Sequence, residues 1–230
     1  MNKLQKTFYL GSCRYQSLFA NIFPARLHST REIINFLKNY KTIDISQAGI
    51  NTVWGDIVHP LVIEHSKLFM NNLELTFNNI EGIVVEVCTR KVYMHNTIPL
   101  NAFFVDFYQE ECAEYKLITL TDDELISDLM FIKKYILEEY GIQKLAVIPH
   151  VNLPLRDTNN LLPERVSLSK ALEKACISYN IDYIDPAKIN FLKTNTTPYI
   201  EDILYDSFHY SYDSVIFQLI LEYLRELGWE

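Results

Sequence analysis

The sequence contains few cysteines, and none of them is placed where paired cysteines usually act. The 230 residues include four cysteines, Cys13, Cys88, Cys112 and Cys176. No two of them form a CxxC pair, and their spacing matches no common zinc site, so we expect no metal centre. A disulfide framework is implausible at this chain length, which favours reduced thiols and a cytoplasmic protein.

Long apolar runs, basic runs and repeats are also missing. No stretch approaches the roughly 18 apolar residues of a membrane span, and the apolar run that follows Lys6 is too short for a secretory signal. The net charge is −8, which together with the absence of basic runs argues against partners such as nucleic acid or anionic membranes. The sequence holds no indication of an oligomeric state.

The chain does contain enough apolar residues for one large domain. Hydrophobic residues make up 49% of it and charged residues 22%, as in globular proteins. Short apolar stretches alternate with helical patterns, and strands are expected over residues 7–10, 42–45, 82–87, 144–149 and 181–185. This alternation predicts an α/β fold with a parallel, doubly wound sheet in a single domain, residues 1–230.

Helix signals separate the expected strands. Residues 15–23 are predicted to form a helix, and capping boxes at Ser29–Glu32 and Thr121–Glu124 begin two more. Residues 91–120 are aromatic and poorly periodic, and two interpretations stay open for them. One is an excursion over the crevice that serves as a lid or acceptor-binding surface, and the other is a β-hairpin packed on the sheet edge.

The first expected strand ends at Gly11, and two side chains able to act as nucleophiles, Ser12 and Cys13, follow at once. Ligands of open α/β sheets bind beyond the carboxyl ends of the strands. A thiol at that place can have a lowered pKa and a ready oxyanion site. The alternative is a tight turn with a packed cysteine. At the far end of the chain, Asp206 and His209 supply an acid and an imidazole before the last helix.

Gly-Ser-Cys after the first strand and Asp-x-x-His before the last helix resemble the SGNH/GDSL-type esterases and acyltransferases. The chain is most similar to the branch with a cysteine nucleophile, such as GSCFA-domain proteins and a capsular-polysaccharide acetyltransferase family. The resemblance spans nearly the whole chain on two of four motif blocks. It implies a flavodoxin-like, five-stranded parallel sheet in a three-layer αβα sandwich, with Cys13 as nucleophile, His209 as base and Asp206 orienting the imidazole.

The same resemblance indicates residues that hold the oxyanion or the substrate. The amides of Cys13 and Gly49 are the expected oxyanion donors, and Ser12, Arg14 and His28 are further candidates; for His28 the alternative is packing in a loop. Where the family has Gly-x-Asn-Asp, this chain has Cys88-Thr89-Arg90-Lys91. Arg90 could replace the asparagine as a donor, or bind a phosphate or carboxylate of the acyl donor or acceptor.

Two other side chains draw attention because of their place on expected strands. Glu86 lies inside an apolar strand, and a buried carboxylate needs a partner, for which Arg90 or a lysine is expected. His150 follows the fourth strand and could reach the same crevice.

Thiol chemistry favours acyl transfer, because moving an acyl group from a thioester to a cysteine is nearly isoenergetic. The first hypothesis is a cysteine-dependent O-acetyltransferase that acts on a polysaccharide or sugar precursor with an acyl-coenzyme A donor, although no coenzyme A motif is readable. One alternative is an SGNH-type esterase on carbohydrate or lipid esters, with Ser12 as a variant nucleophile. The other is a catalytically degenerate SGNH fold that binds a glycan or a protein partner.

Overall fold

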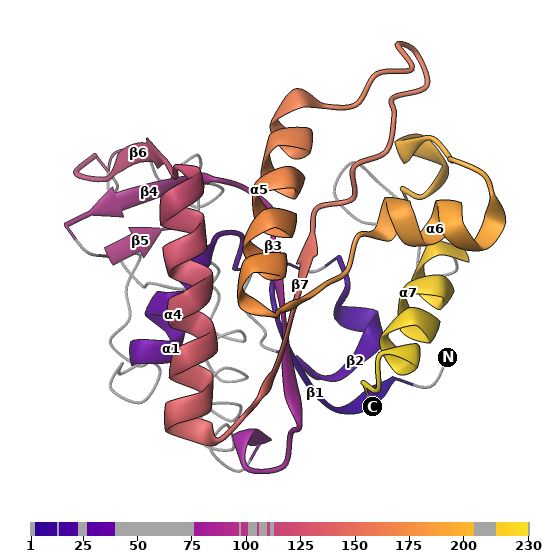
Figure 1. Cartoon of the computed structure of the whole chain (residues 1–230). Helices are drawn as coiled ribbons and strands as arrows, with labels where there is room; N and C mark the ends of the chain where they lie inside the picture. Colours follow the sequence, from indigo (N-terminus) through magenta and orange to yellow (C-terminus); the bar gives the residue numbers. More distant parts are fainter. Residues whose placement is uncertain are drawn as a thin grey trace.

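A computed structural model of the chain describes residues 3–12, 14–22, 27–39, 76–96, 98–100, 105, 110, 113–204 and 215–229 (Figure 1). Five strands of this part form one parallel sheet, in the order β2-β1-β3-β7-β8. They are β1 (Leu4–Leu10), β2 (Phe19–Ile22), β3 (Gly82–Val87), β7 (Lys144–Pro149) and β8 (Asp182–Tyr183). The first strand lies inside the sheet and the second at its edge, which is the flavodoxin-like order. The predicted five-stranded parallel α/β fold is confirmed.

Helices cover both faces of this sheet (Figure 1). One face packs against α1 (Thr30–Asn39), α4 (Asp122–Tyr140) and α5 (Pro163–Tyr179), and the other against α6 (Pro186–Thr194) and α7 (Val215–Glu226). Successive residues of a strand point to opposite faces, so Ile83 and Val85 join the first core, whereas Val84 joins the second. The result is the expected three-layer sandwich with two apolar cores.

The prediction of a helix over residues 15–23 is wrong. The segment forms a single 3-10 turn, η1 (Gln16–Leu18), followed by β2, which pairs with β1 in parallel. Phe19 is fully buried, and its ring stacks on Tyr9 of β1 at a centroid distance of 4.9 Å. Packing against the neighbouring strand therefore decides the conformation of this short aromatic run. The strand expected over residues 42–45 lies outside the described residues.

A second, smaller sheet follows β3. It contains β4 (Lys91–His95), β5 (Ile98–Leu100) and β6 (Lys116–Thr119), antiparallel in the order β5-β4-β6, and it lies beside α1 and α4 (Figure 1). The segment thus contains antiparallel strands, as one interpretation expected, but they form their own sheet and do not extend the main one. A role as lid or acceptor surface stays a prediction.

Helix starts follow the sequence signals closely. The Ser29 hydroxyl and amide both donate to Glu32 Oε2, at 2.6 and 2.8 Å, before α1. Thr121 and Glu124 form the same reciprocal box at the start of α4. A second 3-10 helix, η2 (Ile200–Asp202), precedes the last described residues before α7. Within the described part of the chain, no helix is long and apolar enough to cross a membrane.

Candidate active site

The carboxyl ends of β1, β3 and β7 meet at one edge of the main sheet. The chain leaves β1 toward β2 on one side, and β3 lies on its other side. The crevice between β1 and β3 is therefore the topological switch point, where ligands of such sheets bind. Ser12 follows β1 and Cys88 follows β3, so both lie at this point.

Glu86 ties the turn after β1 to strand β3. Its Oε2 atom accepts from the Ser12 amide at 2.9 Å and from the Ser12 hydroxyl at 2.5 Å, and also from the Tyr9 hydroxyl. Glu86, Ser12 and Tyr9 are all fully buried. Burial, and next the charge of Glu86, raise the pKa of Tyr9 well above its usual value, so this phenol is protonated and donates. The prediction that Arg90 or a lysine is the partner of Glu86 is wrong.

Gly11 permits this close approach. A Cβ atom at position 11 would lie 2.5 Å from Glu86 Cβ and 2.6 Å from the Tyr9 hydroxyl oxygen. Any side chain there would push the carboxylate away from the turn. Gly11 is thus required by the packing of this turn, independently of any chemistry at Ser12 or Cys13.

Arg14 connects the same turn to Cys88. Its Nη1 atom donates to Ser12 Oγ at 3.1 Å and lies 3.8 Å from Cys88 Sγ. The amides of Cys88 and Thr89 donate to the His28 carbonyl oxygen at 2.8 and 3.2 Å. Burial and the charge of Glu86 raise the pKa of the Cys88 thiol well above its usual value, although Arg14 opposes them. Cys88 is therefore a neutral thiol.

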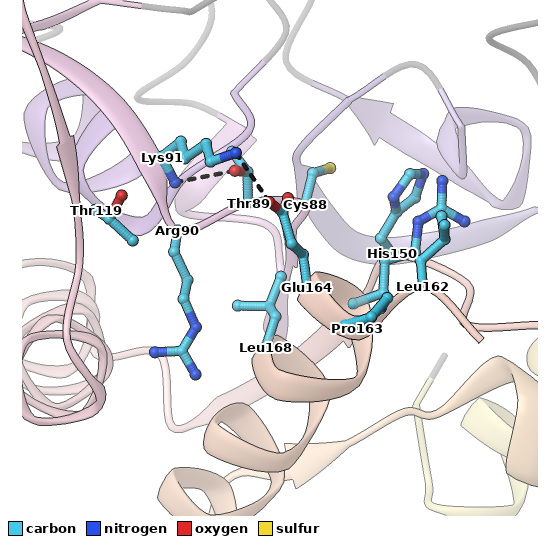
Figure 2. A pocket seen from close by; sticks show the side chains of 11 residues that line it. Cys88, Thr89, Arg90, Lys91, Thr119, His150, Leu162, Pro163, Glu164 and Leu168 are labelled. Atoms are coloured by element: carbon cyan, nitrogen blue, oxygen red, sulfur yellow. Dashed lines mark hydrogen bonds and ion pairs between the residues drawn. The ribbon is translucent and has the colours of Figure 1, made fainter. Parts of the chain in front are cut away.

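A cavity of about 780 Å³ opens at the ends of β3 and β7 (Figure 2). Its lining comes from the residues between β3 and β4, the start of β4, the end of β6, the residue after β7 and the start of α5. It consists of Cys88, Thr89, Arg90, Lys91, Thr119, His150, Leu162, Pro163, Glu164, Arg165 and Leu168. Cys88 and His150 approach it from neighbouring strands (Figure 2). A volume of this size accommodates a small organic ligand.

His150 is a neutral imidazole in this setting. Burial lowers its pKa from 6.5 to about 2, and the positive charges of Arg14 and Arg165 act in the same direction, as does His28. An imidazole that stays uncharged can accept or donate a hydrogen bond toward the cavity.

Arg90 lines the cavity, but its guanidinium points away from Cys88 (Figure 2). One terminal nitrogen, Nη1, donates to Asp122 Oδ1 at 2.5 Å and to the Leu120 carbonyl at 3.3 Å. The other, Nη2, donates to the carbonyl and hydroxyl of Ser167, at 2.9 and 3.2 Å. Its use as an oxyanion donor stays a prediction, and one that requires the guanidinium to leave these acceptors.

The structure brings together Ser12, Arg14 and the backbone of His28, three of the predicted site residues. Apart from Arg90, the remaining predictions, Cys13, Gly49, Asp206 and His209, lie outside the described residues. Both neighbours of Cys13 in the chain, Ser12 and Arg14, are among the described residues. Arg14 contacts Cys88, which lines the cavity. Among the described residues, no group of three or more His, Cys, Asp or Glu side chains could hold a metal ion.

The sequence interpretation missed the roles of Tyr9 and Arg165. Tyr9 looks like an ordinary core aromatic, and only its distance from Glu86 reveals its second role. Arg165 lies in the first turn of α5 and lines the cavity, where its Nη1 donates to the Val151 carbonyl at 2.9 Å. The lone acid inside an apolar strand, Glu86, indicated that a partner was needed but not that Tyr9 supplies it, and nothing in the sequence pointed to Arg165.

No family model and no curated protein matches the chain. Several solved structures align with all of it, among them the following three. A variant of Axe2, an acetyl-xylooligosaccharide esterase from Geobacillus stearothermophilus, is 11% identical, with 97% of its own chain covered and a TM-score of 0.47. Axe2 itself is 11% identical, with 96% covered and a TM-score of 0.45. A GDSL-like lipase from Parabacteroides merdae is 12% identical, with 99% covered and a TM-score of 0.45. Similarity at this level carries no argument about activity.

Proposed function

We propose that this chain is an acyl-transfer enzyme of SGNH-like type in which Cys13 is the nucleophile, His209 its base and Asp206 the residue that orients the imidazole. The observation that carries the proposal is that the hydroxyl of Ser12, the residue before Cys13, is already engaged in hydrogen bonds. Ser12 is fully buried, its hydroxyl donates to Glu86, and the same oxygen accepts from Arg14. A hydroxyl engaged in this way supports Cys13, the next residue along the turn, as the attacking group.

The location supports the same proposal. The turn that carries Cys13 lies at the switch point of the sheet, and it adjoins a cavity large enough for a small substrate. The Glu86 carboxylate anchors this turn to the rigid central strand β3. A nucleophile on a turn anchored in this way loses little conformational freedom when it attacks, as efficient catalysis requires.

The proposed reaction has two steps. In the first, the Cys13 thiolate attacks the carbonyl of an acyl-coenzyme A thioester, and coenzyme A leaves as a thiolate that takes the proton held by His209. In the second, His209 removes the proton of a sugar hydroxyl, the alkoxide attacks the acyl-cysteine, and the Cys13 thiolate leaves. The products are an O-acyl glycan and free coenzyme A. The amides of Cys13 and Gly49 are the proposed oxyanion donors, each of which contributes about 3 kcal/mol in comparable sites.

Intact-mass spectrometry after incubation with acetyl-coenzyme A tests this function. We expect wild type and Cys88→Ala to gain one acetyl group, and Cys13→Ala to gain none. Labelling of Cys13 by an activated phenyl ester alone would instead assign an esterase, in which water replaces the sugar hydroxyl. Failure of both reagents to label a folded protein would contradict the proposal. It would favour the alternative of a catalytically degenerate fold that binds a glycan or a protein partner.

A further inference from the structure

Helices α1 and α4 and the small sheet lie side by side (Figure 1), and a second cavity, of about 630 Å³, opens between them. Its lining comes from one side of α1, the middle of α4, and β4 and β5 with the turn that joins them. Among the described residues, this lining shares no member with the lining of the cavity beside the proposed active site. The second cavity is therefore a separate place on the molecule, and the chemistry proposed for Cys13 does not account for it.

Asn35 of α1 brings a hydrogen-bond donor without an acceptor to this cavity. Its side chain lines the cavity, and the residue is only 8% exposed. The Oδ1 atom accepts from Asn39 Nδ2 at 2.7 Å, one turn further along the helix, whereas Nδ2 has no hydrogen-bond partner within the part of the chain that the structure describes. An unpaired buried donor costs about 1–3 kcal/mol. A ligand oxygen that accepts from Asn35 Nδ2 removes this cost.

Lys38 brings a positive charge to the same wall. It follows Asn35 by three positions on α1, and residues at this spacing are neighbours on a helix surface. Its ammonium lies 4.4 Å from the centroid of the Phe131 ring, which belongs to α4 and also lines the cavity. No carboxylate among the described residues pairs with this ammonium. The ring thus holds the ammonium at the cavity without neutralising its charge.

The other charges at this cavity are already paired. Arg31 Nε donates to Asp128 Oδ2 at 2.8 Å, and the Thr30 hydroxyl donates to the same oxygen at 2.6 Å. Glu124, which does not line the cavity, lies 3.6 Å from Arg31 Nη2. Within the described lining, Lys38 is therefore the charge that lacks a counter-ion.

We propose that this second cavity binds an oxyanion group, a carboxylate or a phosphate, through the Lys38 ammonium and the Asn35 side-chain amide. The oxygens of such a group accept from both donors at once, and its negative charge is the counter-ion that Lys38 lacks. Ile34, Met94 and Pro99 also line the cavity and offer apolar contacts to the rest of the ligand. The inference does not rest on the proposed function.

NMR titration of the ¹⁵N-labelled full chain with sodium acetate, at constant ionic strength, tests the site. We expect the side-chain amide signals of Asn35, identified by their loss in Asn35→Leu, to shift saturably. Lys38→Gln should weaken binding about tenfold, and Asn35→Leu, followed through the backbone amides of α1, about threefold. Lys134→Gln is the control and should leave the affinity unchanged, because this lysine of α4 pairs with Glu138 and does not line the cavity.

Two further titrations identify the kind of molecule that carries the anion. Tighter binding of D-glucuronate than of acetate would indicate a sugar acid, equal affinity a small carboxylate, and tighter binding of inorganic phosphate than of both a phosphate. The inference would be overturned if none of the three shifts the Asn35 amide, or if folded Lys38→Gln binds all three as wild type does. Cys13→Ala should bind acetate like wild type, so binding without acetylation would refute the proposed function alone.

Discussion

The Glu86 carboxylate lies in the middle of the main sheet, where a charge is stable only if several donors surround it. Three donors converge on its Oε2 atom, while Oε1 has no hydrogen-bond partner within the described part of the chain. Two of these donors belong to Ser12, so the cost of burying the carboxylate is offset by contacts that fix the turn before Cys13. Glu86 is therefore a positioning residue for the proposed nucleophile.

Removing one of these donors should cost measurable stability. Tyr9→Phe keeps the ring that stacks on Phe19 and deletes the hydroxyl that donates to Glu86. Because the acceptor is a buried carboxylate, we expect the free energy of unfolding to fall by about 1–3 kcal/mol in urea titrations. Tyr15→Phe is the matched control, since it is equally buried and its hydroxyl donates to a neutral acceptor, the Pro149 carbonyl, at 3.4 Å. Equal losses in the two variants would contradict this role of Tyr9.

His150 should make stability depend on pH. In the unfolded chain it takes up a proton near pH 6.5, whereas in the native state its pKa is lowered to about 2, first by burial and then by Arg14 and Arg165. Between these values the unfolded state binds more protons, so stability is complete above pH 6.5 and is lost as the pH falls below it.

The prediction is that His150→Gln flattens this dependence. Between pH 6.5 and 4.5, the free energy of unfolding of wild type should fall more than that of the variant, by about 1–2 kcal/mol. Urea unfolding at four pH values from 4.5 to 7.5 measures this difference. Parallel curves for wild type and His150→Gln would show that the imidazole is protonated in the folded chain.

At the scale of single elements, the sequence predicts what depends on local contacts. Both capping boxes form as expected, because a serine or threonine three residues before a glutamate satisfies backbone donors within one turn. Strand β3 forms as expected because its β-branched run suits a fully buried strand in a parallel sheet. Strand β2 could not be predicted, since its four residues become a strand only through pairing with β1 and the stacking of Phe19 on Tyr9.

The partner of Glu86 could not be predicted from the sequence for a related reason. Leu10 of β1 pairs with Val85 of β3, and this register places the turn at Gly11 beside Glu86. Register depends on how two distant strands align, which no local pattern specifies. Arg90 shows the same limit, because its partners Asp122 and Ser167 belong to two later helices. The switch point itself was predictable, since it follows from strand order alone, whereas the contacts that fill it were not.

At the scale of the whole molecule, the edge of the sheet opposite the site is closed by residues that follow α7. Trp229 is almost fully buried, and its indole Nε1 donates to Asp182 Oδ2 at 2.8 Å, at the start of β8. The Lys144 ammonium donates to the Gly228 carbonyl at 2.7 Å, at the start of β7. The indole also covers the start of β3, because a Cβ atom on Gly82 would lie 2.5 Å from its Cζ3 atom. Gly228 and Trp229 together thus cover the starts of three parallel strands.

A double-mutant cycle tests this arrangement. Trp229→Ala should lower the free energy of unfolding by about 3–5 kcal/mol, because it leaves a cavity beside the starts of β3 and β8. Gly82→Ala should cost about 1–3 kcal/mol, because the new methyl group displaces the indole. The double variant should cost less than the sum by more than about 1 kcal/mol, since the indole that the methyl group meets is then absent.

The control cycle replaces Gly82 by Gly141, where a Cβ atom would meet nothing within 4 Å and the cost comes from a φ of 70°. Gly141→Ala should therefore add to Trp229→Ala within about 0.5 kcal/mol. Additivity in both cycles would show that Trp229 and Gly82 are not energetically coupled. Because Trp229 and Ser12, the residue before the proposed nucleophile, lie at opposite edges of the sheet, Gly82→Ala should leave the acetylation of folded protein at the level of wild type. Stability and acyl transfer would then be separable along the same strand, β3, which has Gly82 at one end and Glu86 near the other.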